Sequence, residues 1–516
     1  MTLSDQETTE TSTPLDAAGL VGIVDAHSAH DLREVPPEPL VEPKNSEVLH
    51  KELAAFLRGS PAPTEEATTT ASAVRWACER LATGYSPRDL ATAVIAVAAQ
   101  AQPPDTQALS ALLTAATACL GLADRQENSI RQGAATDAES ARISAALVVS
   151  LAATTFRSGQ ATQVVLPNHH AHPASALSDF WQATSDAAPT QAARSWLRLA
   201  EMDSSEAHNA IVSAASTRFC VNEQLLIMTA ALATLGLGTA VHQQLCCSVA
   251  QQIALQAIDE EFAFDQRMQA QLLADQAQSR SPETAGRFER STHERLTALG
   301  TGIAQTPTEQ LAPLLLGSLE DGLTPEDLVD TLALLRAAAY AVTSITAGPA
   351  HEGTNAQAQS ALTACIAADA LQLCMTSTQS LSLRYELALA APMSPSASSL
   401  SSVGELWVPP FDSGGLEDTL LAIADADPDS AAEAATAIPP QDHASTNQAW
   451  LAIRRSVAAD SSLRMQPLAQ VAALERGFRT TDHPAKIWFL AAAARTAAHS
   501  RSHAEPLAAL AEDILS

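Results

Sequence analysis

The sequence predicts an all-α protein, a duplicated helical-repeat array, and three observations support this prediction. The segment Gly-Tyr-Ser-Pro-Arg-Asp-Leu at residues 84–90 returns as Gly-Leu-Thr-Pro-Glu-Asp-Leu at residues 322–328 (322 − 84 = 238). Alanine dominates the apolar residues, and alanine has the highest intrinsic helix propensity. Only 4% of the residues are aromatic, so closely approaching helices rather than layers of bulky side chains must form the interior.

Each copy of the segment has the features of a helix start. Ser86 and Thr324 are suited to the N-cap, and Pro87 and Pro325 to the first helical position, ahead of an apolar run. The segment resembles the helix start found in carboxymuconolactone-decarboxylase-like helical proteins. The chain lacks the C-x-x-C pair and partner histidine of the peroxidase-type members, so the resemblance implies a helix and no activity.

A weaker third copy lies midway between the two. Residues 199–208 match residues 81–90 (199 − 81 = 118), which is about half of the longer period. We therefore expect three or four related helical units. The histidines fall at different places in these units, which favours units that close around a pocket over an open superhelix.

Changes of composition divide the chain further. The N-terminal residues are rich in Thr, Glu and Pro without a helical period, whereas Ser46 is suited to cap the first amphipathic helix. Gly121 and the Gly pairs near residues 236 and 300 interrupt the helical pattern. The predicted segments are a flexible acidic arm (1–45), helical unit 1 (46–189), unit 2 (190–305), unit 3 (306–390), a Ser/Pro-rich linker (391–415) and unit 4 (416–516).

Charge and cysteine content limit the partners and the compartment. The formal net charge of -29 would repel polyphosphate backbones and anionic lipid surfaces, which argues against nucleic acid and membranes as partners. The seven cysteines form no C-x-x-C pair and lie in apolar stretches, as expected for reduced, mostly buried thiols. The N-terminus lacks the pattern of a signal peptide, and no uninterrupted apolar run reaches membrane-spanning length. These features together predict a cytoplasmic protein.

The densest group of candidate ligands is a histidine segment. His169, His170 and His172 lie within four residues, between Pro167 and Pro173, which hold the segment out of a helix. Three imidazoles in a turning loop can converge on a metal ion. The simpler interpretation is a solvent-exposed loop, because no carboxylate lies nearby before Asp179.

Three further histidines are candidate catalytic residues and metal ligands. His208 takes the place of Leu90 in the repeat alignment, so it must be hydrogen-bonded, bound to a ligand or at the rim of the core. His242 lies four residues before Cys246, on the same helical face. His351 follows a Gly-Pro pair at the expected start of another helix. For each of them, a histidine that merely fills or borders the core is the simpler interpretation.

Two hypotheses from different functional classes remain. In the first, the protein is a metal-assisted or acid-base enzyme for a small organic molecule, with His208, His242 and His351 as bases or ligands of a divalent transition metal such as Fe or Zn. In this hypothesis His169, His170 and His172 form a second cluster. The alternative is a non-catalytic helical-repeat scaffold that binds a protein partner. The chain contains no H-E-x-x-H, G-x-S-x-G or phosphate-binding G-x-x-x-x-G-K motif that would decide between them.

Overall fold

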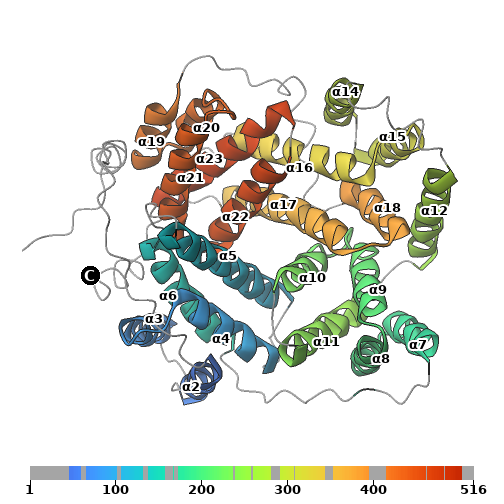
Figure 1. The fold of residues 1–516 in the computed structure, drawn as a ribbon, viewed down its shortest axis with the longest axis horizontal. Helices are drawn as coiled ribbons and strands as arrows, with labels where there is room; N and C mark the ends of the chain where they lie inside the picture. Colours follow the sequence, from blue (N-terminus) through green and yellow to red (C-terminus); the bar gives the residue numbers. More distant parts are fainter. Residues whose placement is uncertain are drawn as a thin grey trace, which may run out of the picture.

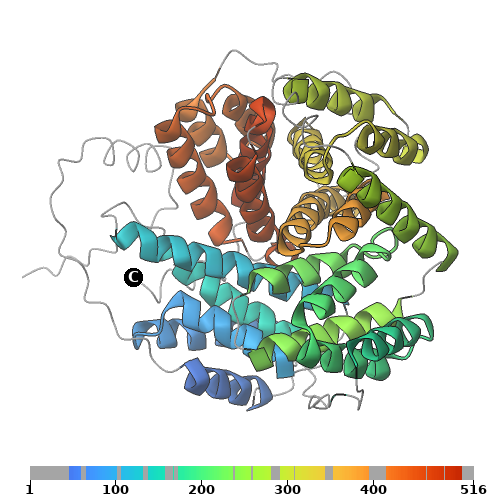
Figure 2. The ribbon, with the colours of Figure 1, turned by 45° about the vertical axis from the view of Figure 1, so that its right-hand side comes forward.

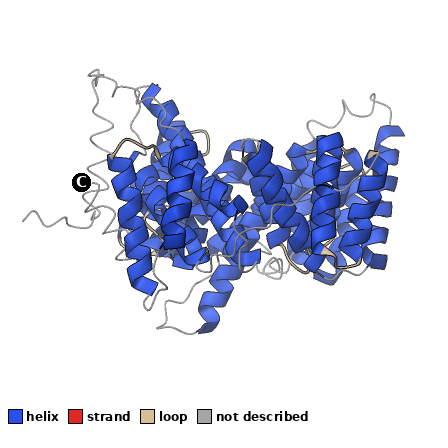
Figure 3. Ribbon diagram, turned by 90° about the horizontal axis from the view of Figure 1, so that it is seen from below, coloured by secondary structure: helices blue, strands red, loops and turns tan. Residues whose placement is uncertain are grey.

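The described part of the protein is built from helices alone. The computed structural model describes residues 46–59, 66–100, 106–131, 138–156, 167, 172–235, 239–256, 260–279, 291–306, 308–342, 352–393, 414–460, 462–481 and 483–502. No strand occurs in these residues, so the all-α prediction is confirmed (Figure 3). The predicted N-terminal arm and most of the Ser/Pro-rich linker lie outside the described residues.

The first half of the chain forms one side of the molecule in Figure 1, and the second half forms the other. The helices of the first half are α2 (Ser46–Gly59), α3 (Glu66–Ala82), α4 (Pro87–Gln100), α5 (Thr106–Arg131), α6 (Ala138–Thr155), α7 (Pro173–Ser185), α8 (Pro189–Met202), α9 (Ser204–Ser216), α10 (Gln224–Thr234), α11 (Thr239–Leu255) and α12 (Glu260–Ser279).

The second half contains the remaining helices of the described chain. They are α14 (Ser291–Gln305), α15 (Thr308–Glu320), α16 (Pro325–Val342), α17 (Glu352–Ser377), α18 (Leu381–Ala390), η1 (Ala391–Met393), α19 (Leu416–Ala424), α20 (Pro428–Thr436), α21 (His443–Ala458), η3 (Ser462–Met465), α22 (Gln466–Thr480), η4 (Pro484–Lys486) and α23 (Ile487–Ser502). Helix α12 lies at the outer edge of the molecule beside α18 (Figures 1 and 2).

The two copies of the repeated segment adopt the same turn. Gly84 and Gly322 have φ values of 95° and 96°, a left-handed conformation that favours glycine, and each ends the helix before the turn. The next helix is capped in both copies by a reciprocal pair. The backbone N–H of Ser86 donates to the Asp89 carboxylate (2.9 Å), and the Asp89 N–H donates to Ser86 Oγ (3.1 Å). Thr324 forms the same pair with the aspartate three residues later. The predicted N-caps are therefore confirmed.

A second pair of turns matches across the halves, and the sequence pattern did not single it out. Ala187 and Ala426 have φ values of 51° and 55°, and a helix beginning with proline follows two residues later in each case. These prolines, Pro189 and Pro428, are one residue further apart than the two glycines above (428 − 189 = 239). The start of α20 at Pro428 therefore matches the start of α8 at Pro189, and it is not a further copy of the segment at residues 84–90.

Two predicted helix breaks are wrong. Helix α5 continues through Gly121, and α14 continues through Gly300 and Gly302. A Cβ atom at Gly121 would meet nothing within 4 Å, and one at Gly302 would meet only Leu314 Cδ2 at 3.7 Å. A glycine inside a helix destabilises that helix slightly, because its backbone loses more conformational entropy on folding. The packing of the surrounding helices offsets this loss. The break predicted near residue 236 does separate α10 from α11.

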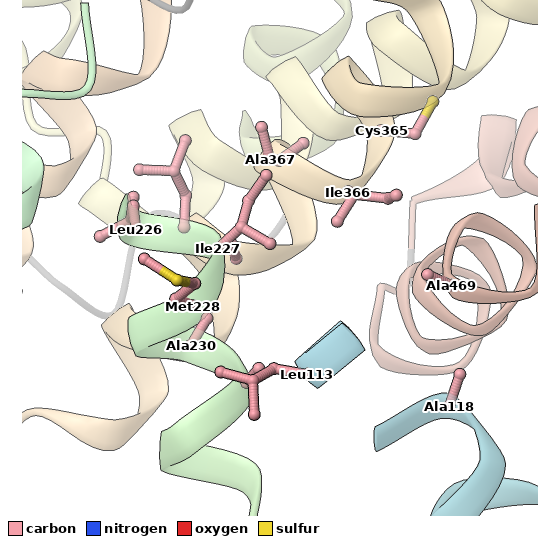
Figure 4. Packing of buried hydrophobic residues seen from close by; sticks show 14 of the residues in the cluster. Leu113, Ala118, Leu226, Ile227, Met228, Ala230, Cys365, Ile366, Ala367 and Ala469 are labelled. Atoms are coloured by element: carbon pink, nitrogen blue, oxygen red, sulfur yellow. The ribbon is translucent and has the colours of Figure 1, made fainter. Parts of the chain in front are cut away.

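Four helices, two from each half, pack together at the centre of the molecule. Helix α10 packs against α5 and α17, and α22 packs against the same two helices. Leu113, Ile227, Ile366 and Ala469 contribute one buried side chain each from these four helices (Figure 4). One apolar core runs from Leu49 in α2 to the last helix, α23, so the boundaries of the predicted units are not boundaries between separate cores.

A small cavity lies where the four central helices meet. Its volume is about 30 Å³, and its polar lining consists of Thr114, Thr117, Thr234, Asp369 and Arg476. This is room for about two water molecules, because one water needs about 10–15 Å³ of such volume. A small organic molecule would fit here only after side chains move apart.

Part of α5 has the length and composition of a membrane span. Residues 106–125 have a mean hydropathy of 1.4, although no such run was expected from the sequence. In the structure, 67% of this stretch is buried inside the protein, where α5 is one of the four central helices. A core helix of a helical protein has these same properties.

Candidate functional site

The histidine segment lies at the start of α7. Of its three histidines only His172 is among the described residues, while His169 and His170 are not. His172 is exposed and occupies the N-cap of α7, but its side chain makes no capping hydrogen bond. The predicted convergence of the three imidazoles on a metal therefore stays a prediction.

His208 does not occupy the core position that the repeat alignment gave it. Helix α9 is capped by Asp203, whose side chain accepts from the Glu206 N–H, and not by the aligned Ser204. The helix thus starts one residue early. Ala207, which is fully buried, takes the position that Leu90 holds in α4, and His208 turns about 100° towards the rim, where it is half-buried.

His208 holds α9 to the end of α17. Its Nε2 lies 2.9 Å from Ser377 Oγ, and Ser377 Oγ donates to the Cys374 carbonyl at 2.9 Å. Ser377 Oγ therefore contacts both the His208 imidazole and the backbone of its own helix. Beside it, Thr378 Oγ1 donates to Asn209 Oδ1 at 2.7 Å. These two hydrogen bonds join α9 to the end of α17.

His242 on α11 is the neighbour of His208. Burial lowers the pKa of both imidazoles, and the charge of His242 lowers the pKa of His208 further. Cys246 lies on the same helical face as predicted, with its Sγ 3.8 Å from His242 Nε2. Burial raises the pKa of the Cys246 thiol far above its ordinary value, so this sulfur stays protonated. The pair His208 and His242 is therefore neutral at pH 7.

The structure brings two of the three candidate catalytic histidines, His208 and His242, together. Within the described ranges, no three His, Cys, Asp or Glu side chains lie close enough to hold a metal ion. His351 precedes α17 and lies outside the described residues. His208 and His242 alone make an incomplete set, because a metal site needs three or more ligands in a defined geometry.

The thiols agree with the prediction from the sequence. All seven cysteines are free, and six of them are buried. Cys220, in the turn between α9 and α10, is the exposed one.

A buried carboxyl that the sequence analysis missed lies between α9 and α18. Glu386 is 5% exposed, and its carboxylate accepts from Ser213 Oγ (2.9 Å) and Ser216 Oγ (2.6 Å). Burial raises the pKa of Glu386 to about 7, against the lowering effect of the two hydroxyls and Arg267. A glutamate directly before the apolar run Leu-Ala-Leu-Ala was a signal in the sequence, because a carboxyl at the edge of such a run is easily buried and then needs partners.

A second missed group is an ion-pair network around Glu475. This fully buried carboxylate binds Arg125 of α5, Arg454 of α21 (3.1 Å) and Arg479 of its own helix (2.7 Å). Burial alone would raise the pKa of Glu475, but the three guanidinium groups outweigh it and the pKa is lowered. The network ties the first half of the chain to the second and has no free position for a substrate.

Helix α12 carries an apolar row on its solvent side. Phe264, Met268 and Leu272 are 58%, 46% and 56% exposed. Their spacing of four residues places them along one face of the helix. The opposite face, which includes Ala270 and Leu273, is buried and packs against α18.

Comparison of the chain with protein-family models, with curated proteins and with solved structures finds no match in any of the three.

Proposed function

We propose that this protein is a helical scaffold that binds a protein partner through α12. The observation that carries the proposal is the exposed row Phe264, Met268 and Leu272. An apolar row that lies on one face of a helix and is not covered by the described part of the chain is typical of an interaction surface. Single exposed apolar residues are common, whereas a row of three at helical spacing is a continuous strip.

The other exposed apolar side chains support this location. Six large hydrophobic residues of the described chain are exposed, and five of them lie between residues 221 and 272. Of these five residues, Val221 and Leu255 lie outside α12. The Arg218 Nε donates to the Gln256 carbonyl at 3.4 Å, which brings the turn with Val221 to the end of α11 with Leu255.

The scaffold consists, in our proposal, of two copies of one unit rather than three or four. Helices α4 and α16 begin 238 residues apart, and α9 and α21 begin 239 residues apart, each of the latter after a capping aspartate. The packing supports the same assignment, since α5 packs with α10 as α17 packs with α22. In this proposal the weaker match at an offset of 118 is not a third copy of the unit. Its helix, α9, starts one residue earlier than the alignment with α4 requires.

A photo-cross-linker at position 268 tests the proposed function. The variant is incubated with an extract of the native host, and a second variant carries the cross-linker at Val48, an exposed apolar residue of α2. We expect a discrete cross-linked product at position 268 that is absent at position 48 and is lost when Phe264 and Leu272 are both replaced by Ser. Identical product patterns at both positions would contradict the proposal.

The free thiols fit a reducing compartment, so we also propose a cytoplasmic location.

An acid-base or metal-assisted enzyme is the second candidate function. The neighbouring imidazoles of His208 and His242, with lowered pKa values, are the observation that favours it, because perturbed titratable groups gather at catalytic sites. Elemental analysis of the purified protein tests this candidate. Near-stoichiometric Fe or Zn that is lost in His208→Ala and His242→Ala would favour the metal-assisted enzyme, and a metal-free protein would contradict it.

A further inference from the structure

The orientation of α12 is fixed by its inner face. Gln266 Nε2 donates to the Glu386 carbonyl of α18 at 3.1 Å, and Ala263, Ala270 and Leu273 are buried on the same side. The row with Met268 therefore cannot rotate into the core without breaking this contact. No side chain of the described residues covers the row.

The surroundings of the row are acidic. On the α-helical wheel, Glu261 and Asp275 extend the row at its two ends, and the exposed Asp265 flanks it. Arg267 is the only basic residue of α12, and its guanidinium lies over the Trp181 ring of α7 at 4.7 Å, away from the row. Gln271 Nε2 also donates to Asp275 Oδ1 at 2.8 Å. The charged side chains of α12 beside the row are thus acidic.

We propose that the occupant of this face is an amphipathic helix of another protein whose apolar side is bordered by Lys or Arg. The inference rests on the proposed scaffold function and adds the chemistry of the partner. The row from Phe264 to Leu272 is about 12 Å long, which matches two turns of a packed helix. Basic residues beside the apolar contacts would pair with Asp265 and Asp275, as flanking charges do between paired helices.

A second copy of this chain fits the face poorly. Two α12 helices packed face to face would bring Asp265 and Asp275 of both copies together, and the formal net charge of -29 adds a long-range repulsion. A nucleic acid or an anionic lipid surface would meet the same negative field. Charge complementarity therefore selects a basic partner.

Two designed peptides test the proposal. Both have about 18 residues, enough to cover the row, and both carry the same leucine face, but one has Lys and the other Glu at every polar position. Binding to the full-length protein is followed by fluorescence anisotropy at about 150 mM salt, where exposed charges are already screened beyond about 8 Å. We expect the Lys peptide to bind at least about tenfold more tightly than the Glu peptide.

Matched variants show whether the peptide lies on α12. The double variant Phe264→Ser/Leu272→Ser should weaken the Lys peptide at least about tenfold, and Asp265→Asn/Asp275→Asn should weaken it about threefold or more while leaving the apolar row intact. The controls are Val48→Ser and Asp418→Asn/Asp425→Asn, the latter in an acidic hollow between α19 and α20, and they should bind as the parent does. All the substitutions outside that hollow are at exposed positions, and circular dichroism verifies the fold.

Three results would overturn the inference. The first is that the Lys and Glu peptides bind the protein equally tightly. The second is that the α12 variants bind the Lys peptide as tightly as the control variants do. The third is that the protein forms a concentration-dependent dimer in sedimentation and that Phe264→Ser/Leu272→Ser abolishes this dimer. If cross-linking at position 268 captures a partner but the Lys peptide does not bind, the basic-helix chemistry is wrong and the scaffold function stands. If neither is observed, both fail.

Discussion

Glu386 makes the stability of the protein depend on pH in an unusual direction. In the folded protein the Glu386 carboxyl stays protonated up to about pH 7. In the unfolded chain the same carboxyl loses its proton near its ordinary pKa of 4.5. Between these two values the folded state binds more protons than the unfolded state, so stability falls as pH rises through this window. The expected loss is of the order of 3 kcal/mol, because each pKa unit corresponds to about 1.4 kcal/mol.

The substitution Glu386→Gln is therefore expected to raise the melting temperature at about pH 8 and to change it little at about pH 5, where the parent carboxyl is already neutral. The amide side chain can still bond to Ser213 and Ser216. Thermal unfolding by circular dichroism across this pH range measures the difference. The exposed Glu417→Gln serves as the control and should show no such pH dependence. A constant offset between Glu386→Gln and the parent at all pH values would refute this explanation.

Glu475 makes the stability of the protein depend on pH in the opposite direction. Its pKa is lowered in the folded protein, so it stabilises the fold above its unfolded value near 4.5, and this stabilisation is lost as pH falls through the lower, folded value. We expect Glu475→Gln to destabilise the protein by about 3–5 kcal/mol at neutral pH, because three guanidinium groups then lose their counter-charge. Urea unfolding measures the loss, with the exposed Glu433→Gln as control. A loss as small as that of the control would mean that solvent already screens the three arginines.

At the scale of the helix, replacing different glycines by alanine is expected to change the stability of the protein in opposite directions. Gly84→Ala and Gly322→Ala place a Cβ at φ values of 95° and 96°, which should destabilise the protein by about 1–2 kcal/mol each. Gly121→Ala lies inside α5 with no atom near the new Cβ, so it should stabilise by about 0.5–1 kcal/mol. Melting temperatures of the three single variants test this contrast. It fails if Gly84→Ala and Gly121→Ala shift the melting temperature in the same direction.

These same elements show what the sequence could predict. The Gly-x-Ser/Thr-Pro signal gave the starts of α4 and α16, because left-handed glycine, the capping hydroxyl and the proline act through local geometry. The breaks at Gly121 and Gly302 were wrong, because packing outweighs the small helix penalty of one glycine. The start of α9 was missed by one residue, because Asp203 and Ser204 are both good N-caps and only the fold selects between them.

At the scale of the whole molecule, the sequence could not identify the candidate surface. Helix α12 has one apolar row with Phe264 and Met268 and another with Ala270 and Leu273, and only the position of α18 decides which row is buried. Long-range partners were equally hidden, since Arg125 and Glu475 meet across 350 residues of sequence. The proximity of His208 and His242 depends on how α9 and α11 pack and was not apparent from the sequence, while His351, the third candidate, lies outside the described residues.

The two halves are expected to associate without a covalent link. The central helices α5 and α10 of the first half bury apolar side chains against α17 and α22 of the second, so separate halves would expose this surface to water. We predict that fragments 1–285 and 286–516 copurify when coexpressed and that each alone aggregates or pairs with itself. Ile227→Asp, a substitution at a residue 3% exposed in that interface, should abolish copurification, because an unpaired charge is buried at a cost of several kcal/mol. Val48→Asp, at an exposed position, should leave it intact. Two soluble monomeric fragments that do not bind each other would show that the halves are independent domains and that the central interface contributes little to the fold.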